Sequence, residues 1–204
     1  MDCWYPGARG GRSIAQLLFG EFSPSGKLPV TFYQGTENLP EVTDYSMAHR
    51  TYRYENKNVL YPFGYGLHYG KVVYDEEKVS ARVTDVAQEV TVSVTVTNES
   101  DYPLWETVQV YVKRQDAQEF EPGFQLKGIA CVPLTAGEKR KVAITLTTRD
   151  FAYITEEGEC KVRPGDYVIA IGGQQPDERS AELTGQQVTC LKVSKTGEEI
   201  LVEY

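Results

Sequence analysis

Apolar and polar residues alternate along several short segments in the second half of the chain. In residues 90–96 every second residue is valine, and the others are threonine or serine. The same alternation recurs in three further segments: 107–112, 141–146 and 167–171. A period of two turns one face of a β-strand toward a core and the other toward solvent. These four segments are therefore predicted to be half-buried β-strands.

Turn-forming residues separate the predicted strands, at 98–101, 135–138 and 163–166. About seven short strands over roughly 100 residues are typical of an immunoglobulin-like β-sandwich. The Cys-Trp-Cys spacing of antibody domains is absent, which favours the fibronectin type III variant. Residues 150–153 are predicted to form a short corner strand. Residues 188–193 and 199–204, separated by a turn at Gly197, are predicted to form a C-terminal hairpin, so that the mainly β domain covers residues 72–204.

The first 40 residues have a different pattern. Residues 13–19 are good helix formers with apolar residues on one side, and Gly20 stands where a helix C-cap glycine belongs. After a turn at 23–26, residues 28–32 are predicted to form a short strand in which Pro29 indicates an edge position. One helix and one strand cannot bury their own faces. Residues 1–40 are therefore predicted to be an incomplete α/β remnant.

Residues 41–71 have no regular period but are rich in aromatic side chains: Tyr45, Tyr52, Tyr54, Tyr61, Phe63, Tyr65 and Tyr69. So many rings outside a regular element need a surface to pack on. We expect this aromatic-rich linker to be an extended arm that lies across a neighbouring surface.

Length and charge exclude several classes of protein. A chain of 204 residues is too short for a (β/α)8 barrel of about 250 residues together with another domain. The net charge of −8, without a basic block, argues against nucleic-acid binding. No run of about 18 apolar residues is present, so no membrane span is expected. The N-terminus lacks the basic and apolar regions of a signal peptide, which favours a cytoplasmic location.

Neither a metal site nor a cofactor site is predicted. The cysteines are widely spaced without a CxxC pair, which indicates four free thiols, although one disulfide among the last three is an alternative: Cys3, Cys131, Cys160 and Cys190. His49 and His68 do not fall in HxH or HExxH patterns, so we expect loop histidines. The glycines of residues 7–11 lack the Gly-Lys-Ser/Thr of a phosphate-binding loop and indicate a tight loop that enters a helix.

A series of motifs resembles family 3 glycoside hydrolases. These are WYPG and the following Gly-Gly in residues 4–11, PSGKLPVTF at 24–32, RTYRY at 50–54 and YPFGYGL at 61–67. Four later segments resemble the fibronectin type III-like domain of that family: 108–111, 126–128, 134–138 and 164–167. The resemblance covers nearly the whole chain in order. Ser23 stands where the family usually has Asn, and His68 where it usually has Ser.

The resemblance implies what this chain lacks. The family has an N-terminal barrel with the nucleophilic Asp, then an α/β domain that often carries the acid/base Glu upstream of WYPG. Retaining hydrolysis needs two carboxyl groups about 5 Å apart, and no such pair is expected here. We therefore expect the C-terminal structural portion of a retaining enzyme that acts on terminal β-linked sugars, not catalytic by itself and using neither a metal nor an organic cofactor. Segments 39–47 and 172–177 favour the β-xylosidase branch, with a β-glucosidase next.

The missing barrel and α/β domain are the expected partners, and a separate chain could supply the barrel. The apolar side of the predicted helix, with Ile14, Leu17 and Leu18, is also expected to promote self-association. The alternative is a free-standing β-sandwich that binds carbohydrate or protein. An exposed planar row of aromatic rings would distinguish this alternative.

No catalytic residue is predicted. Tyr52, Arg53 and Tyr54 are the candidates for lying near a sugar, because aromatic faces stack on pyranose rings and arginine binds hydroxyls or carboxylates. The alternative is that these three residues brace the arm. Asp44 lies between Thr43 and Tyr45, a context that resembles that of the family's nucleophile, but its place in the chain predicts a loop carboxylate.

Overall fold

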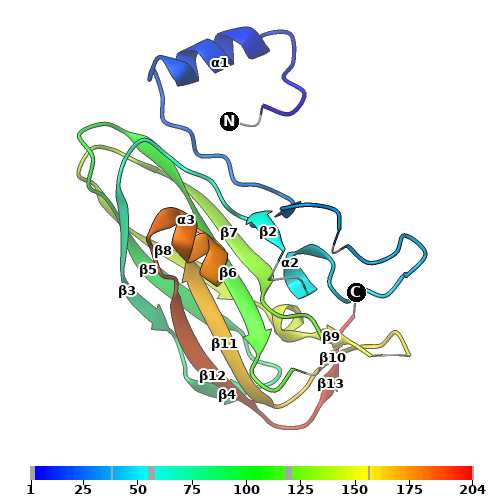
Figure 1. Cartoon of the computed structure of the whole chain (residues 1–204). Helices are drawn as coiled ribbons and strands as arrows, with labels where there is room; N and C mark the ends of the chain where they lie inside the picture. Colours follow the sequence, from blue (N-terminus) through cyan, green and yellow to red (C-terminus); the bar gives the residue numbers. More distant parts are fainter. Residues whose placement is uncertain (1–2, 38, 55–57, 118–120, 156, 204) are drawn as a thin grey trace.

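The computed structural model describes residues 3–203 apart from 38, 55–57, 118–120 and 156, and it is mainly β (Figure 1). The elements before the sandwich are α1 (Gly10–Leu18), β1 (Phe32–Tyr33), α2 (Thr51–Tyr54) and β2 (Val59–Tyr61). The later strands are β3 (Val72–Val79), β4 (Val83–Asp85), β5 (Val90–Asn98), β6 (Leu104–Arg114), β7 (Gln125–Leu134), β8 (Lys139–Leu146), β9 (Tyr153–Ile154), β10 (Cys160–Val162), β11 (Gly165–Gly172), β12 (Thr189–Thr196) and β13 (Ile200–Leu201). The 3-10 helix η1 (Thr148–Phe151) and helix α3 (Glu178–Thr184) interrupt them.

Two sheets form the sandwich. One has the order β3-β5-β8, and the other has the order β4-β12-β11-β6-β7. Neighbouring strands are antiparallel except for β4 and β12, which are parallel. All four strands predicted from the alternating pattern are present, as β5, β6, β8 and β11, and they lie in these two sheets. The prediction of a mainly β, fibronectin type III-like sandwich is confirmed.

The core between the sheets is built largely from valine. Alternate residues of β5 point inward, so that Val90, Val92 and Val96 have no exposed surface. They meet apolar residues of β6, β8 and β11 in one cluster. β-Branched side chains suit this position because they pack well on a pleated surface. The Tyr167 hydroxyl also donates a hydrogen bond to the Arg163 carbonyl, 2.8 Å away, which resembles the tyrosine corner of immunoglobulin-like folds.

The C-terminal hairpin predicted at 188–193 and 199–204 is wrong. β12 is present, but β13 pairs with β10 in a small separate sheet. Both edges of β12 are already occupied, by β11 and by β4, and this leaves no edge for β13. The segment before β12 also contains α3, which was not predicted. Its N-terminus is capped by Asp177, and Gly185 ends it in the left-handed conformation with φ 71°.

Two smaller predictions are also corrected. The corner strand predicted at 150–153 begins only at Tyr153, because Asp150 accepts hydrogen bonds from the Thr147 amide and hydroxyl and closes the turn of η1. The strand predicted at 28–32 is reduced to its last residue, which with Tyr33 forms β1. Leu28 instead exchanges backbone hydrogen bonds with residues 64 and 65.

Helix α1 stands away from the sandwich (Figure 1). The predicted helix is present as α1, and its C-terminus has the expected glycine: Gly20 has φ 75°. Gly20 donates to the Leu17 carbonyl and Glu21 to the Gln16 carbonyl, which is a Schellman motif. No helix in the described part of the chain is long and apolar enough to span a membrane.

Candidate functional site

The arm packs on the outer face of β6 through aromatic rings. Tyr52 stacks on Phe63 with the ring centroids 4.0 Å apart, and meets the edge of Tyr111 at 6.4 Å. The Tyr52 hydroxyl accepts a hydrogen bond from the Leu126 amide of β7, 3.1 Å away. Tyr111 has no exposed surface, and burial raises its pKa strongly. The aromatic arm therefore covers the outer face of β6 next to β7, and its rings pack against the sheet.

Gln109 fixes the position of the arm next to these rings. Its amide nitrogen donates to the carbonyls of Gly64 and Gly173, each at 3.0 Å, and its oxygen accepts from the Tyr111 hydroxyl at 2.5 Å. Gly64 has φ +77°, and an added Cβ would lie 2.4 Å from the Gln109 oxygen. The close approach of the arm to β6 thus requires glycine at this point.

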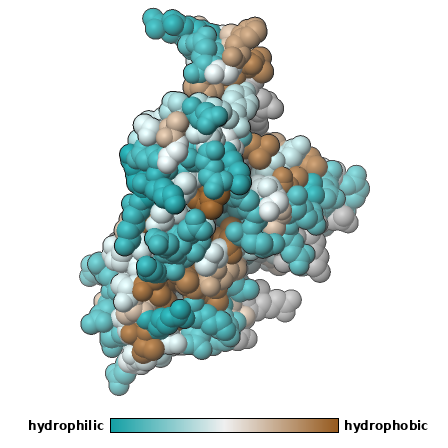
Figure 2. All heavy atoms as spheres, turned by 90° about the vertical axis from the view of Figure 1, so that its left-hand side faces the viewer, coloured by the Kyte–Doolittle hydropathy of each residue, from teal (hydrophilic) through white to brown (hydrophobic). Residues whose placement is uncertain are grey.

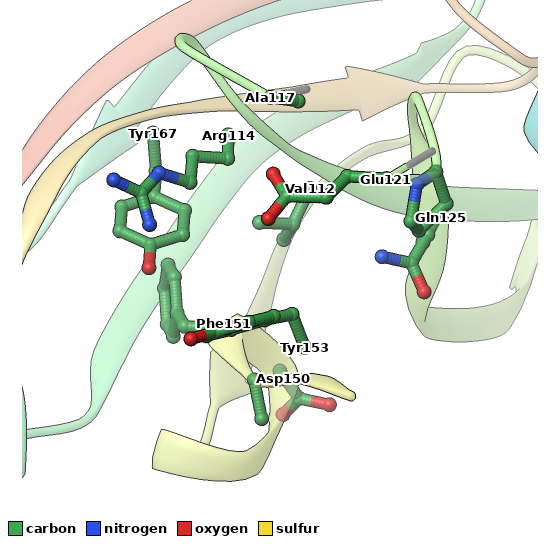
Figure 3. A pocket seen from close by; sticks show the side chains of 11 residues that line it. Val112, Arg114, Ala117, Glu121, Gln125, Asp150, Phe151, Tyr153 and Tyr167 are labelled. Atoms are coloured by element: carbon green, nitrogen blue, oxygen red, sulfur yellow. The ribbon is translucent and has the colours of Figure 1, made fainter. Parts of the chain in front are cut away.

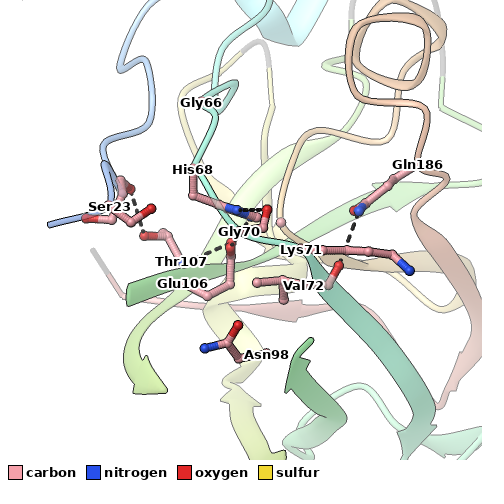
Figure 4. Close-up of polar contacts among 12 residues, drawn as sticks. Ser23, Gly66, His68, Gly70, Lys71, Val72, Asn98, Glu106, Thr107 and Gln186 are labelled. Atoms are coloured by element: carbon pink, nitrogen blue, oxygen red, sulfur yellow. Dashed lines mark hydrogen bonds and ion pairs between the residues drawn. The ribbon is translucent and has the colours of Figure 1, made fainter. Parts of the chain in front are cut away.

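A buried ionic cluster joins three parts of the chain (Figure 4). The Glu106 side chain, on β6, is 2% exposed. Its carboxylate lies 3.5 Å from Nζ of Lys27 in the N-terminal segment and 3.2 Å from Nε2 of His68 in the arm. The other ring nitrogen of His68 lies 2.7 Å from the Gly70 carbonyl. Because both nitrogens face acceptors, the imidazolium form can donate both hydrogen bonds.

The pKa of Glu106 results from opposed effects. Burial raises the pKa, but the hydrogen bond from His68 and the nearby charges of Lys27 and His68 lower it, so that it lies below the ordinary value. The Tyr74 hydroxyl lies beside the carboxylate, where burial and the Glu106 charge raise its own pKa well above 10. Glu106 is therefore ionised at neutral pH and holds Lys27 and His68 against the sandwich.

The residues proposed to lie near a sugar make contacts within the chain. The Arg53 guanidinium donates to the Gln125 side chain, and the Arg53 carbonyl accepts from the Gly123 amide at 2.7 Å. Tyr52 is held between Phe63 and β7, as described above. Tyr54 is half-buried. Bracing of the arm is thus a visible role of Tyr52 and Arg53, while contact of any of the three with a sugar stays a prediction.

The other sequence candidates lie apart from one another. Asp44 is an exposed loop residue that accepts the Ser46 amide at 2.8 Å, and this hydrogen bond is the main reason that its pKa is lowered. His49 is exposed. All four cysteines are free thiols, so the alternative of one disulfide is wrong. No group of three or more metal-ligating side chains occurs among the described residues.

A cavity beside the C-terminal end of β6 is too small for a sugar (Figure 3). It has a volume of about 30 Å³ and lies between Arg114, Gln125, η1 and Tyr167. This volume corresponds to room for about one or two waters. Arg163 stacks on Tyr153 at 3.9 Å nearby and forms an ion pair with Glu121. The cavity is thus a structural gap beside an ion pair.

The surface of residues 1–70 is rich in uncovered apolar side chains. Of the 20 large apolar side chains exposed among the described residues, 14 lie in this part. On α1 and its C-cap, Leu18 is 65% exposed and Phe19 is 85% exposed. In Figure 2 apolar side chains gather on the lobe that carries α1. The first 70 residues therefore have an anchored side, facing β6, and an apolar side without a partner in the described structure. Patches of this kind usually mark an interface.

This arrangement defines the class of the chain: a fibronectin type III-like sandwich that holds the end of an α/β domain on one sheet. Two family models match it, the glycosyl hydrolase family 3 C-terminal domain over residues 1–69 and the fibronectin type III-like domain over residues 106–175. The chain belongs to family 3 of the glycoside hydrolases and corresponds to their C-terminal part.

Similar proteins support this assignment. The xylan 1,4-β-xylosidase of Xylanibacter ruminicola is 38% identical over 90% of this chain and 21% of its own length. An exo-α-(1→6)-L-arabinopyranosidase of Bifidobacterium longum is 37% identical over 87% of this chain and 25% of its own length. The crystal structure of a β-glucosidase from Bifidobacterium adolescentis matches 90% of this chain and 28% of its own, with a TM-score of 0.75 and 32% identity. The chain thus spans about a fifth to a quarter of these curated relatives.

The ionic cluster could not be found from the sequence. Lys27, His68 and Glu106 are far apart along the chain, and no local motif connects them. The one sequence signal is that Glu106 continues the alternation of Val108, Val110 and Val112, so that a carboxylate stands at an inward-facing position.

Proposed function

We propose that this chain is the structural C-terminal portion of a retaining glycoside hydrolase that acts on terminal β-linked sugars, and that it is not catalytic by itself. The observation that carries the proposal is that residues 1–70 have two different sides. Their anchored side is fixed to the sandwich by Glu106 and Gln109, and their apolar side has the composition of a domain interior. The partner that fits the apolar side is the remainder of the α/β domain, with the barrel beyond it.

A β-xylosidase is the preferred parent activity. Among the similar proteins, the Xylanibacter ruminicola relative named as a xylosidase has the higher identity, 38%, and the Bifidobacterium adolescentis β-glucosidase has 32%. A β-glucosidase is the second candidate for the parent activity, in keeping with the order that the sequence motifs favour.

The catalytic part of the proposal is tested by assaying the chain alone on aryl β-xyloside and aryl β-glucoside. We expect no turnover above the buffer rate, because retaining hydrolysis needs two carboxyl groups about 5 Å apart across the sugar. Turnover that is abolished by Asp44→Asn would overturn it.

The structural part is tested by replacing the matching C-terminal fifth of the Xylanibacter ruminicola relative with this chain. The chimera is expected to be soluble and to retain hydrolysis of the aryl glycoside that the relative cleaves. The same chimera with Leu18→Asp is expected to lose solubility or activity, since the charge would fall in the proposed domain interior. The matched control is Lys192→Asp on β12, outside the N-terminal segment. Full activity of the Leu18→Asp chimera would contradict the proposed contact.

A further inference from the structure

A second, larger cavity lies at one end of the sandwich. It has a volume of about 310 Å³ and is bounded by the start of β3, the end of β11 and the residues that flank α3. Small-molecule sites have volumes of about 300–1,000 Å³. The cavity is therefore large enough for one small ligand. It lies where the arm ends, because Lys71 is part of its lining, and none of its lining residues belongs to the apolar surface around α1. Figure 4 shows Gln186 reaching toward Val72 at its edge.

The cavity combines an apolar surface with uncharged polar groups. Val188 and Tyr74 supply apolar surface, whereas Val72 and Ile171 are each only 1% exposed. The polar lining consists mainly of amides and a hydroxyl: Gln174, Gln186, Gln187 and Thr189. Sites for small polar ligands typically have this composition, a largely apolar wall with a few polar groups that fix the orientation of the ligand.

The two charged side chains of the lining are already paired. Lys71 lies 2.6 Å from Glu99, and Glu77 accepts a hydrogen bond from the Thr189 hydroxyl at 3.0 Å. The charges of Lys71 and Glu77 are opposite, so the lining has no net charge. The lining thus offers no excess charge to an anion or a cation, and it favours a neutral ligand.

The glutamine amides are positioned by the backbone and keep further hydrogen-bonding capacity. The Gln186 side-chain nitrogen donates to the Val72 carbonyl at 3.2 Å, and that of Gln174 donates to the Gln186 carbonyl at 2.9 Å. Each amide also has a second N–H and a carbonyl oxygen. Because a hydroxyl group both donates and accepts, adjacent hydroxyls of a sugar are complementary to such amides.

We propose that this cavity binds a single neutral pyranose, with its hydroxyls on the glutamine amides and Thr189 and its apolar face against Tyr74 and Val188. The site would bind sugar without cleaving it. The proposal does not depend on the parent activity, and it places carbohydrate binding in a cavity instead of on a row of exposed rings. Affinity in the millimolar range is expected for so small a ligand.

The test is an NMR titration of the ¹⁵N-labelled full chain with D-xylose and D-glucose, and with sulfate as the charged probe. We expect saturable shifts for at least one sugar at residues 71–77, 172–174 and 186–189, and none of these with sulfate. Gln187→Leu and Thr189→Val should each weaken binding about fivefold, the loss expected for one hydrogen bond. Gln187 is exposed, so its replacement is expected to leave the fold intact.

The matched control is Thr145→Val on β8, because the Thr145 hydroxyl also bonds another side chain, Thr91, at 3.0 Å but lies outside the cavity. Its affinity should equal that of the unchanged protein. Three results would overturn the proposal: no saturable shift with either sugar, sulfate-induced shifts in the cavity, or equal weakening by Thr145→Val and Gln187→Leu. A thermal melt of each variant shows whether the fold is retained.

Discussion

Replacing Glu106 with glutamine removes one negative charge from the point where three parts of the chain meet. The shape of the side chain is nearly unchanged, and Oε1 can still accept the Thr107 amide, 3.0 Å away. The change therefore acts on the ion pairs with Lys27 and His68. In the variant, Lys27 and His68 face a neutral amide instead of a carboxylate.

The expected loss of stability follows from burial. Removing one partner of a fully buried ion pair costs about 3–5 kcal/mol. Glu106 is 2% exposed, but the Lys27 and His68 side chains retain 13% and 17% exposure, and water can partly solvate them. We therefore expect Glu106→Gln to lower the free energy of unfolding by about 2 kcal/mol. The control is Glu99→Gln, which breaks the more exposed pair with Lys71 and should cost less than about 1 kcal/mol.

Urea denaturation at several pH values measures the loss of stability and its dependence on pH. Because the pKa of Glu106 is lower in the folded state than its ordinary value of 4.5, its contribution is present above that value and is lost as the pH falls through the folded-state pKa. Glu106→Gln should thus lose stability at pH 7 and show a flatter decline in acid. Equal stability of the variant and the unchanged protein at pH 7 would refute the role of the cluster as an anchor.

Three further predictions concern the arm, the boundary and the apolar surface. Gly64→Ala should destabilise the chain by about 2–4 kcal/mol in urea, whereas Gly137→Ala, which has φ +69° but open space, should cost about 1 kcal/mol; equal losses would contradict the close contact with Gln109. A shorter chain of residues 72–204 should melt cooperatively, and a broad transition would argue against a boundary near residue 71. The full chain should self-associate more than this shorter chain by light scattering, and Leu18→Ser should reduce the effect; monomers throughout, without binding of a hydrophobic dye, would disprove it.

The sandwich could be predicted because its strands carry a local signal. The alternation of apolar and polar residues is visible within each strand, and this alternation alone is enough to predict a half-buried strand. The pairing of strands is not local. β13 resembles a hairpin partner of β12 in the sequence, but the order of the sheet is decided by which edges remain free.

The sequence signal of helix α3 lies in its cap residues and not in apolar periodicity. Asp177 and Gly185 are typical cap residues, and the Ser180 amide bonds the Asp177 carboxylate at 2.9 Å. The segment is short and polar, so it resembles a tail when only apolar periodicity is considered.

The sequence indicated an arm that packs on a neighbouring surface, but not the contacts that hold it. Those contacts depend on Glu106 and Gln109, two polar residues of β6 whose partners are dozens of residues away. Gln109 alternates with the core residues Val108 and Val110, so in the sequence it has the pattern of a solvent-facing residue. Only the folded chain shows that it is buried.

The parallel pairing of β4 with β12 has a consequence for synthesis of the chain. Ser194 lies beside Val83, so the contact joins residues that leave the ribosome far apart in time. Contacts between distant residues form slowly, and domains fold as they emerge from the N-terminal end. A nascent chain that ends before residue 194 therefore leaves β4 without its neighbour, and the five-stranded sheet can close only after β12 has been translated.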